Sequence, residues 1–140
     1  MKEKIKEQIL ASVTMKETMV NNCIDDIESA ANLMIQSIRE GGKILWCGNG
    51  GSAGDAQHLA TELMGGMTSH ERKPIPSVAL TTDSSFITAW SNDTDFESIF
   101  SRQVQGLGIE GDVLVGISTS GNSKNVIAAI KQAKYKGLKT

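Results

Sequence analysis

The fold of this chain is decided by the stretch Ile44-Leu45-Trp46-Cys47-Gly48-Asn49-Gly50-Gly51-Ser52. Its apolar start predicts a buried strand, and the glycine-rich turn leads into a helical pattern from Ala53 to about Met64. Such a turn presents free backbone N–H groups and the positive end of a helix dipole, which suits a phosphate group. The order of strand, glycine-rich turn and helix therefore predicts a phosphate-binding loop.

A second loop of the same kind follows the apolar run Val113-Leu114-Val115-Gly116-Ile117. It reads Ser118-Thr119-Ser120-Gly121-Asn122-Ser123, and its four hydroxyl groups can surround phosphate oxygens without a lysine or an arginine. Ligands of parallel α/β sheets bind beyond the carboxyl ends of the strands, where both loops are expected to lie. Together the loops predict a phosphorylated small molecule held at one edge of a parallel sheet.

Apolar runs and helical patterns alternate from residue 43 onward. Strands are predicted at 43–47, 77–80 and 112–117, and helices after the first at 84–91, 96–107 and 123–136. Strands that are continuous apolar runs separated by helices indicate a parallel sheet covered on both faces. The predicted fold class is therefore α/β, with a doubly wound parallel sheet of the flavodoxin-like type.

Residues 1–40 contain no strand pattern and predict two helices. Their apolar residues recur at three- and four-residue spacing in two stripes: Ile5, Ile9 and Val13, then Ile24, Ile27, Ala30, Met34 and Ile38. Asn21-Asn22 is the predicted interruption, and Gly41-Gly42 the predicted end of the second helix. We expect this helical region (1–40) and the alternating region (41–140) to form one structural domain, with the helices covering the sheet or packing against a second subunit.

The last three residues, Leu138-Lys139-Thr140, follow Gly137 at the point where a fourth strand is expected to begin. A sheet edge left open at its third strand is a liability for aggregation. The sequence is therefore expected to come from a longer protein whose C-terminal part is missing.

Composition excludes several classes of protein. The chain has 140 residues, of which 39% are hydrophobic and 21% charged, as in folded globular domains. A net charge of −2 does not provide the basic field that nucleic acids or membrane surfaces require, and the lysines near the C-terminus are interpreted as a solvated helix face. Cys23 and Cys47 lack metal-binding spacing and are predicted to be buried free thiols. With no signal peptide or membrane span in the pattern, the predicted location is the cytoplasm.

The helix after the first loop carries His58 and Glu62, four residues apart and therefore on one face. An imidazole and a carboxylate at this spacing can supply two ligands to a metal such as zinc, or the carboxylate can act as a general base. Spacing alone favours an exposed pair without a function. Their position after a phosphate-type loop favours chemistry, because a carboxylate beside a sugar phosphate can remove the proton next to a carbonyl.

Other polar residues have plain structural interpretations. Asp83 or Ser84 is predicted to cap the next helix, and substrate contact stays an open alternative. Asn92-Asp93 offers donors and acceptors for sugar hydroxyls, but by itself the pair is a turn motif. His70 is predicted to be a solvated loop residue rather than a third metal ligand. The core is expected to include both tryptophans, Trp46 and Trp90.

One competing motif is the dinucleotide fingerprint G-x-G-x-x-G/A, which residues 48–53 fit. In this alternative Asp83, at the end of the next strand, would contact a ribose. However, Asp83 lies 30 residues beyond Ala53, whereas the usual spacing is about 20 residues. The hydroxyl-rich second loop would also have no role, so the sugar-phosphate interpretation is preferred.

Taken together, these motifs point to a known family. They are CGNGGSAGDAQHLATEL, IPSVALTTD, the Asn92-Asp93 pair and EGDVLVGISTSGNSKNVIAAI. They resemble the sugar isomerase (SIS) domain and, more narrowly, the bacterial sedoheptulose-7-phosphate (phosphoheptose) isomerases. The resemblance reaches from the N-terminal helices to Thr140 and implies a zinc-binding, cytoplasmic homotetramer. It also implies conversion of sedoheptulose 7-phosphate to D-glycero-D-manno-heptose 7-phosphate, for lipopolysaccharide or capsule.

The resemblance implies roles for individual residues. Glu62 would be the catalytic acid–base carboxylate beside the substrate, and zinc would bind His58 and Glu62. Substrate contacts would fall to Asn49, Gly50, Gly51, Asn92 and Asp93, and phosphate contacts to Ser118, Thr119, Ser120 and Ser123, with Ser52 assisting.

The sequence departs from the family pattern in its metal ligands. In the family a glutamine and a second histidine from a C-terminal helix complete the zinc site, and this sequence does not contain that helix. The isolated chain is therefore expected to bind zinc weakly and to turn over poorly. Gly54, where relatives often carry alanine or a polar residue, is a minor departure.

Two rival functions stay open. A non-catalytic SIS protein that binds a protein partner, such as a replication initiator, would use the same scaffold. Glu62 and Ser120 favour the isomerase, because that relative lacks the carboxylate and has arginine in place of the serine. A regulatory sugar-phosphate sensor would keep both loops and need no base.

Overall fold

A computed structural model describes all 140 residues, and the chain divides into two compact units, Met1–Leu33 and Met34–Thr140. None of the helices combines the length and the apolar character needed to cross a lipid bilayer. The expectation that residues 1–40 and 41–140 form one structural domain stays a prediction.

The first unit contains helix α1 (Lys2–Asn22) and the start of helix α2 (Ile24–Arg39). The two helices are interrupted at Cys23, directly after the predicted Asn21-Asn22; its backbone leaves the helical region, and its N–H donates to the Met19 carbonyl at 2.8 Å. No side chain of α1 is buried. The predicted stripe of Ile5, Ile9 and Val13 is therefore exposed, by 55%, 60% and 46%.

The second unit is built on a three-stranded parallel sheet. Its strands are β1 (Ile44–Gly48), β2 (Ser77–Ala79) and β3 (Val113–Ile117), in the order β2-β1-β3. Ile44 of the central strand pairs with Ser77 on one side and with Val113 on the other. Each strand lies within one residue of its predicted bounds, because buried apolar runs between helices are strong strand signals.

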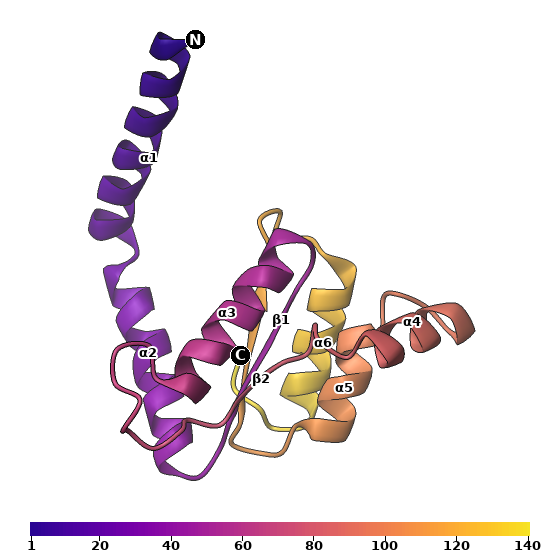
Figure 1. The fold of residues 1–140 in the computed structure, drawn as a ribbon. Coiled ribbons are helices and arrows are strands. Elements are labelled where there is room, and N and C mark those ends of the chain that lie inside the picture. Colours follow the sequence, from indigo (N-terminus) through magenta and orange to yellow (C-terminus); the bar gives the residue numbers. More distant parts are fainter. The chain divides into compact units, whose positions relative to one another are not determined.

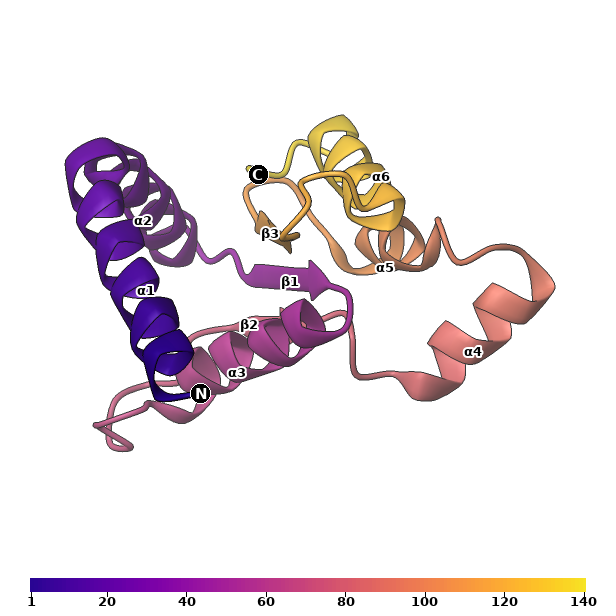
Figure 2. The same cartoon turned by 90° about the horizontal axis from the view of Figure 1, so that it is seen from above.

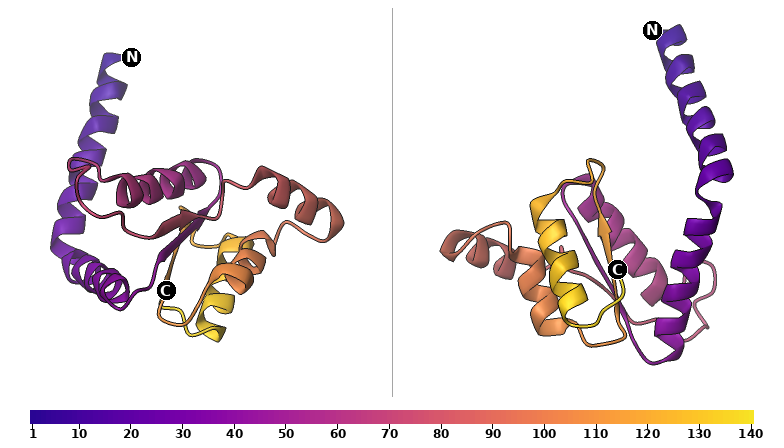
Figure 3. Two further views of the ribbon diagram at one scale, coloured as in Figure 1. Left: turned by 60° about the horizontal axis from the view of Figure 1, so that its bottom comes forward. Right: turned by 180° about the vertical axis from the view of Figure 1, so that it is seen from behind.

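Helices cover both faces of the sheet, which confirms the doubly wound α/β class. Helix α3 (Gly51–Gly65) packs against β1 and β2 on one face, and helices α5 (Ile99–Leu107) and α6 (Lys124–Tyr135) lie side by side on the other (Figure 2). Figure 3 shows the α5–α6 pair from two further sides. Helix α4 (Ser84–Asp93) lies away from the sheet and has no buried side chain.

The main core lies between the sheet and the α5–α6 pair. Leu45 and Cys47 of β1 point into it, as does Leu114 of β3, and Phe100 of α5 is 2% exposed. Trp46 points to the opposite face, as alternation along a strand requires. It is buried, and its indole N–H donates to the Ser77 hydroxyl at 2.8 Å.

Trp90 packs on the edge of this core rather than inside it. Its ring stacks with Phe86 at 5.8 Å between centroids, and the Arg102 guanidinium lies 5.0 Å from the ring centre. Its indole N–H donates to the Ser98 hydroxyl at 2.8 Å. Trp46 is therefore a core residue, as predicted, whereas Trp90 is only partly buried at the edge of the core.

A buried acid holds the opposite end of the sheet together. Asp112 is fully buried and accepts hydrogen bonds from the Lys43 ammonium at 2.6 Å, the Lys43 N–H at 2.9 Å and the Ile109 N–H at 2.9 Å. Three donors on one carboxylate offset its loss of hydration. The contact fixes the entries of β1 and β3 next to each other.

Helix ends follow the predicted signals with three exceptions, one of which is that α4 ends at Asp93 rather than at residue 91. The Asp83 side chain caps α4 by accepting the Phe86 N–H at 2.8 Å, and Gly66 ends α3 in the left-handed region at φ +104°. Helix α5 begins at Ile99 rather than Phe96, because the Asp95 carboxylate accepts the Ser98 N–H at 2.6 Å and forms a turn there. Helix α3 begins two residues earlier than predicted, at Gly51.

Lys139 lies where a fourth strand is predicted to begin. It forms a parallel bridge with Val113, in which the Leu114 N–H donates to the Lys139 carbonyl at 2.9 Å and the Lys139 N–H donates to the Asp112 carbonyl at 2.8 Å. The chain thus extends the sheet beside β3, on the side away from β1.

Candidate active site

The two predicted loops meet at the carboxyl edge of the sheet. β1 and β3 are neighbours and run parallel, so the Gly48–Gly50 turn and the Ser118–Ser123 loop leave the sheet at the same edge (Figure 1). Gly48 permits the first of these turns, because a Cβ at this position would lie 2.7 Å from the Ser52 carbonyl oxygen. A glycine here lets α3 start directly over the end of its strand.

Three of the four predicted hydroxyls come together in the second loop. The Ser118 hydroxyl lies 2.9 Å from the Ser123 hydroxyl and 3.4 Å from that of Ser120. Gly121, at φ +66°, makes the tight turn that folds the loop back on itself. Thr119 is exposed at the tip and makes no side-chain hydrogen bond to the three serines. The result is a cluster of hydroxyl groups in front of α6.

The start of α6 presents backbone donors next to this cluster. Ser123 is the N-cap residue, yet its side chain accepts no hydrogen bond from the first turn. The first intrahelical bond runs from the Ile127 N–H to the Ser123 carbonyl at 3.0 Å, so the N–H groups of Lys124 and Asn125 have no partner within the helix. Hydroxyl and N–H donors at a helix start suit an anion.

The glycine-rich turn has a similar character. Gly50 has φ +56° and ψ −120°, a conformation that side chains strongly disfavour, and α3 starts immediately after it. Gly51 and Ser52 occupy the first turn, and Ser52 is 9% exposed. The turn therefore brings backbone N–H groups to the same edge as the serine cluster.

Asn49 joins the two loops through a residue that the sequence analysis missed. Its side-chain amide donates to the Asn125 Oδ1 at 2.8 Å, and the Asn125 amide donates back to the Asn49 Oδ1 at 2.8 Å. Asn125 is 3% exposed and stands in the first turn of α6. The only signal in the sequence was a polar residue two positions after the serine loop, inside the predicted helix 123–136.

A pocket of about 260 Å³ opens beside this pair of asparagines. It is lined by Asn49, Phe96, Glu97, Ser123, Lys124 and Asn125. The Lys124 ammonium lies 4.0 Å from the Glu97 carboxylate, and both side chains are largely exposed. Phe96 and Glu97 were not predicted as site residues, because the α4–α5 connection reaches the loops only in three dimensions. Lys124 was not predicted either, because it was interpreted as part of a solvated helix face.

His58 and Glu62 lie on one face of α3, as their spacing predicts, and this face is open to solvent. The His58 Nε2 is 3.8 Å from the Glu62 Oε1; the His58 side chain is 70% exposed and the Glu62 side chain 27%. Glu62 is eleven residues beyond Gly51, which corresponds to about 16 Å along the helix axis. The pair is therefore well separated from the first turn of its own helix.

Asn92 and Asp93 belong to α4, which lies away from the sheet (Figure 2). Both residues are exposed in the last turn of α4, and the Asn92 amide donates to the Asp93 carboxylate at 2.8 Å. His70 is exposed and its Nδ1 lies 3.2 Å from the Gly65 carbonyl, which agrees with a loop residue.

The predicted metal ligands form a pair on α3, His58 and Glu62. No three side chains of histidine, cysteine, aspartate or glutamate come together as a metal-binding group. The imidazole nitrogen and the carboxylate are donors that zinc accepts, and their separation of 3.8 Å allows one ion to contact both. The residues present thus fit two positions of a zinc coordination sphere.

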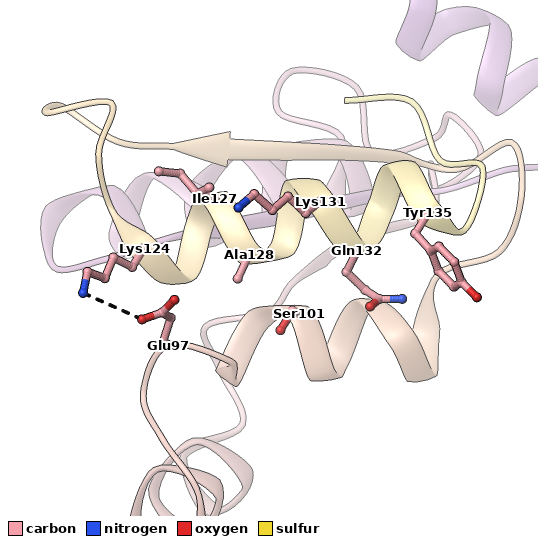
Figure 4. A pocket seen from close by; sticks show the side chains of 8 residues that line it. All are labelled: Glu97, Ser101, Lys124, Ile127, Ala128, Lys131, Gln132 and Tyr135. Carbon is pink, nitrogen blue, oxygen red and sulfur yellow. Dashed lines mark ion pairs between the residues drawn. The ribbon is translucent and has the colours of Figure 1, made fainter.

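A larger cavity of about 560 Å³ lies between α5 and α6 (Figure 4). Its lining runs from Glu97 and Lys124 at one end to Tyr135 at the other, and it contains none of the predicted site residues. The chemistry-bearing residues lie instead around the smaller pocket and on α3.

One titratable group near the site has a strongly perturbed pKa. Cys47, in β1 just before the glycine-rich turn, is fully buried, and desolvation raises the pKa of its thiol from 9.0 to about 12. The thiol is therefore neutral and unreactive in the folded chain. Cys23 is only half-buried, so the prediction of a buried thiol is confirmed for Cys47 and wrong for Cys23.

Comparison with known proteins gives the family. The model of the SIS domain matches residues 9–140. The phosphoheptose isomerase of Nitratidesulfovibrio vulgaris is 49% identical over 134 residues, which are 96% of this chain and 64% of that protein. The phosphoheptose isomerase of Sulfurimonas denitrificans is 49% identical over 142 residues, which are 100% of this chain and 72% of that protein.

Solved structures agree with the sequence relatives. The structure of phosphoheptose isomerase GmhA from Neisseria gonorrhoeae has a TM-score of 0.91 and 47% identity, with 98% of this chain and 71% of that chain covered. A phosphoheptose isomerase from Francisella tularensis has a TM-score of 0.93 and 38% identity, with 97% and 71% covered. The chain spans 64% to 72% of the lengths of these four proteins. The chain therefore belongs to the SIS domain family, within the group of the phosphoheptose isomerases.

Proposed function

We propose that the protein is a sugar-phosphate isomerase that converts sedoheptulose 7-phosphate into D-glycero-D-manno-heptose 7-phosphate, an early step toward the heptose of lipopolysaccharide or capsule. The names of its relatives support this activity. The observation that carries the proposal is the cluster of Ser118, Ser120 and Ser123 hydroxyls at the start of α6, beside Asn49.

The substrate phosphate binds in the serine loop. Its oxygens accept hydrogen bonds from hydroxyl groups and from the free N–H groups at the start of α6, and the helix dipole adds a favourable field. No lysine or arginine is needed, because hydrogen bonds from N–H and hydroxyl groups to a negatively charged phosphate at the start of α6 are strong. The phosphate ligands are Ser118, Thr119, Ser120 and Ser123, with Ser52 from the neighbouring turn.

The sugar is held by the glycine-rich turn and by polar side chains around it. Asn49, Gly50 and Gly51 line the turn, and the absence of side chains at the glycines lets the sugar approach the backbone. Asn92 and Asp93 offer further contacts to sugar hydroxyls, once α4 or a neighbouring subunit brings them to the substrate.

Glu62 moves the proton in the isomerisation. Its carboxylate removes a proton from the carbon next to the carbonyl, the electron pair forms an enediol, and the proton returns to the adjacent carbon, so no atom is gained or lost. The reacting carbons lie at the opposite end of a seven-carbon chain from the phosphate. A base three turns along α3 from the anion loops suits a substrate of that length.

Zinc is the proposed cofactor, and His58 and Glu62 are its ligands in this chain. When bound, it supplies a Lewis acid that stabilises negative charge on a substrate oxygen. Two ligands are fewer than zinc sites usually have, so this chain by itself is expected to hold the ion weakly.

The proposed assembly is a cytoplasmic homotetramer. The exposed apolar stripe of α1 supports self-association, because such a surface needs a partner in water. Two free cysteines are typical of a reducing compartment.

The test is a direct assay of the full-length protein with sedoheptulose 7-phosphate and zinc, followed by NMR of the sugar carbons. Appearance of heptose 7-phosphate supports the proposal, and its absence with zinc present contradicts it. Unphosphorylated sedoheptulose is the control substrate and should stay unconverted, because it cannot use the serine loop.

A separate measurement tests the dinucleotide alternative. A rise in melting temperature with sugar phosphate and no change with NAD would exclude that alternative.

A further inference from the structure

Asn125 makes three hydrogen bonds that link separate parts of the anion site. Its Oδ1 accepts the Asn49 amide at 2.8 Å and the Val126 N–H at 2.9 Å, and its amide donates to the Asn49 Oδ1 at 2.8 Å. Asn125 is 3% exposed, and its bond to Val126 is buried, whereas its two bonds to the half-buried Asn49 are partly buried. Asn125 and Asn49 are 76 residues apart in the chain, so this is a tertiary contact between the two loops.

The bond to Val126 explains why the Ser123 hydroxyl does not cap α6. A serine at an N-cap ordinarily accepts the N–H of the second or third helical residue. Here Asn125 takes the N–H of the third helical residue, Val126, and the Ser123 hydroxyl turns to Ser118 at 2.9 Å instead. The Asn125 side chain thereby satisfies the Val126 N–H, and the Ser123 hydroxyl stays at the serine cluster, where a ligand can reach it.

The pairing with Asn49 fixes the orientation of a second donor. An amide held by two reciprocal hydrogen bonds cannot rotate, and one N–H of the Asn49 amide remains for a ligand in the pocket that both asparagines line. Preorganised donors lower the cost of binding, because no reorientation is needed when the ligand arrives.

We propose that Asn125 is a positioning residue for the anion site: it clasps Asn49 across the two loops and holds the Ser123 hydroxyl available for a phosphate. The inference rests on the proposed function, because it assumes that the serine loop binds an anion. Asn125 itself acts through Asn49 and Ser123.

The experiment is a titration of the full chain with inorganic phosphate, followed by the backbone and side-chain amide signals in ¹⁵N NMR spectra. Wild type should show shifts at Ser120, Ser123 and Lys124. Asn125→Ala should weaken phosphate binding by about tenfold or more, because it leaves the half-buried Asn49 amide without its partner and free to turn away from the pocket. Val104→Ala, a core variant of α5 distant from the loops, is the control for lost stability and should bind phosphate as wild type does.

Asn125→Ser separates positioning from a purely structural role. Its hydroxyl keeps a polar group in the first turn of α6 but is too short to reach Asn49, so phosphate binding should stay weak, and the melting temperature measured beside it shows how much of the loss is structural. The side-chain amide signals of Asn49 should also lose their dispersion. Wild-type affinity in Asn125→Ser would overturn the inference.

A double-mutant cycle completes the test. If Asn125 acts through Asn49, the double variant Asn49→Ala/Asn125→Ala binds no more weakly than the worse single variant. Additive losses of phosphate affinity would overturn the proposal that Asn125 acts through Asn49. Absence of phosphate shifts in wild type would overturn both this inference and the proposed anion site, whereas wild-type binding that Asn125→Ala leaves unchanged would overturn the inference alone.

Discussion

Glu62 stands next to an imidazole on the open side of α3, with a little over a quarter of its side chain exposed. Glu62→Gln preserves its size and hydrogen-bonding reach but removes the proton acceptor. The full-length variant is expected to lose about a hundredfold or more in kcat, while its affinity for sugar phosphate changes little, because the phosphate binds at the loops. NMR turnover and calorimetric binding measure the two quantities.

Glu71→Gln is the matched control for Glu62. It makes the same change of charge in the loop after α3, where Glu71 is exposed. Full turnover is expected for this variant. Undiminished turnover of Glu62→Gln would remove Glu62 from the proposed chemistry.

Cys47 makes the stability of the fold depend on alkaline pH. Burial raises the pKa of its thiol to about 12, so between the ordinary value of 9.0 and about 12 the unfolded chain releases the proton and the folded chain keeps it. The free energy of unfolding should therefore fall as pH rises through this range, by up to about 1.4 kcal/mol per pH unit, and Cys47 should add no pH dependence below it. Urea unfolding at about pH 7 and about pH 10.5 measures the slope.

The variant Cys47→Ala isolates this contribution, because the other titrating groups are unchanged. Its absolute stability is lower, since a buried group is lost, but its alkaline slope should be shallower than that of wild type. Equal slopes for the two proteins would show that the thiol does not titrate differently on unfolding.

Individual site residues were predictable where a local pattern marks them. The serine loop and the glycine-rich turn follow apolar strands directly, so Asn49, Ser118 and Ser123 are visible in the sequence. Asn125 is not, because its role depends on a partner 76 residues earlier. Glu97 and Lys124 likewise meet only after the α4–α5 connection folds back toward the loops.

At the scale of elements, β3 and α6 pack more closely than strands and helices usually do. A Cβ on Gly116 would lie 2.6 Å from the Val126 Cγ1. Gly116→Ala is therefore expected to push α6 off the sheet and to lower the free energy of unfolding by about 1–3 kcal/mol. Urea unfolding monitored by circular dichroism checks this.

Gly54→Ala is expected to have the opposite effect on stability and to raise the free energy of unfolding. Gly54 lies inside α3, and a Cβ there has no neighbour within 4 Å. The gain in helix propensity should stabilise the chain by about 0.5–1 kcal/mol. A stability for Gly116→Ala equal to that of wild type would show that β3 and α6 adjust without cost.

The elements themselves were largely readable from the sequence. Continuous apolar runs marked all three strands, and glycine or aspartate marked several helix ends, as Gly66 and Asp83 show. The start of α5 was wrong by three residues, because a hydrogen bond from the Ser98 N–H to Asp95 competes with the helical pattern. The start of α3 was missed because glycine propensity argues against a helix that tertiary packing nevertheless forms there.

At the scale of the whole molecule, the exposed apolar stripe of α1 offers a surface through which copies of the chain can associate. Ile9 is 60% exposed at its centre. If this surface joins copies of the chain, Ile9→Glu should shift a tetramer toward smaller species, because it places a charge in an apolar interface. Light scattering after size-exclusion chromatography measures the mass.

Gln8→Glu is the control, since it adds a charge at the neighbouring position off the stripe and should leave the mass unchanged. A tetramer that persists in Ile9→Glu would place the interface elsewhere. The sequence indicated surplus apolar surface on these helices, but periodicity alone does not say what covers such a face.

The strand order β2-β1-β3 also determines at which stage of folding the protein is able to bind phosphate. Ile44 must pair with Val113, 69 residues further along the chain, and contacts of such long range form late because closing a long loop is entropically costly. A nascent chain that has produced only β1, α3 and β2 has one open side on its central strand and no second loop. Gain of phosphate binding during refolding should therefore trail the recovery of helical signal, so that affinity for the anion reports the last cooperative step of folding.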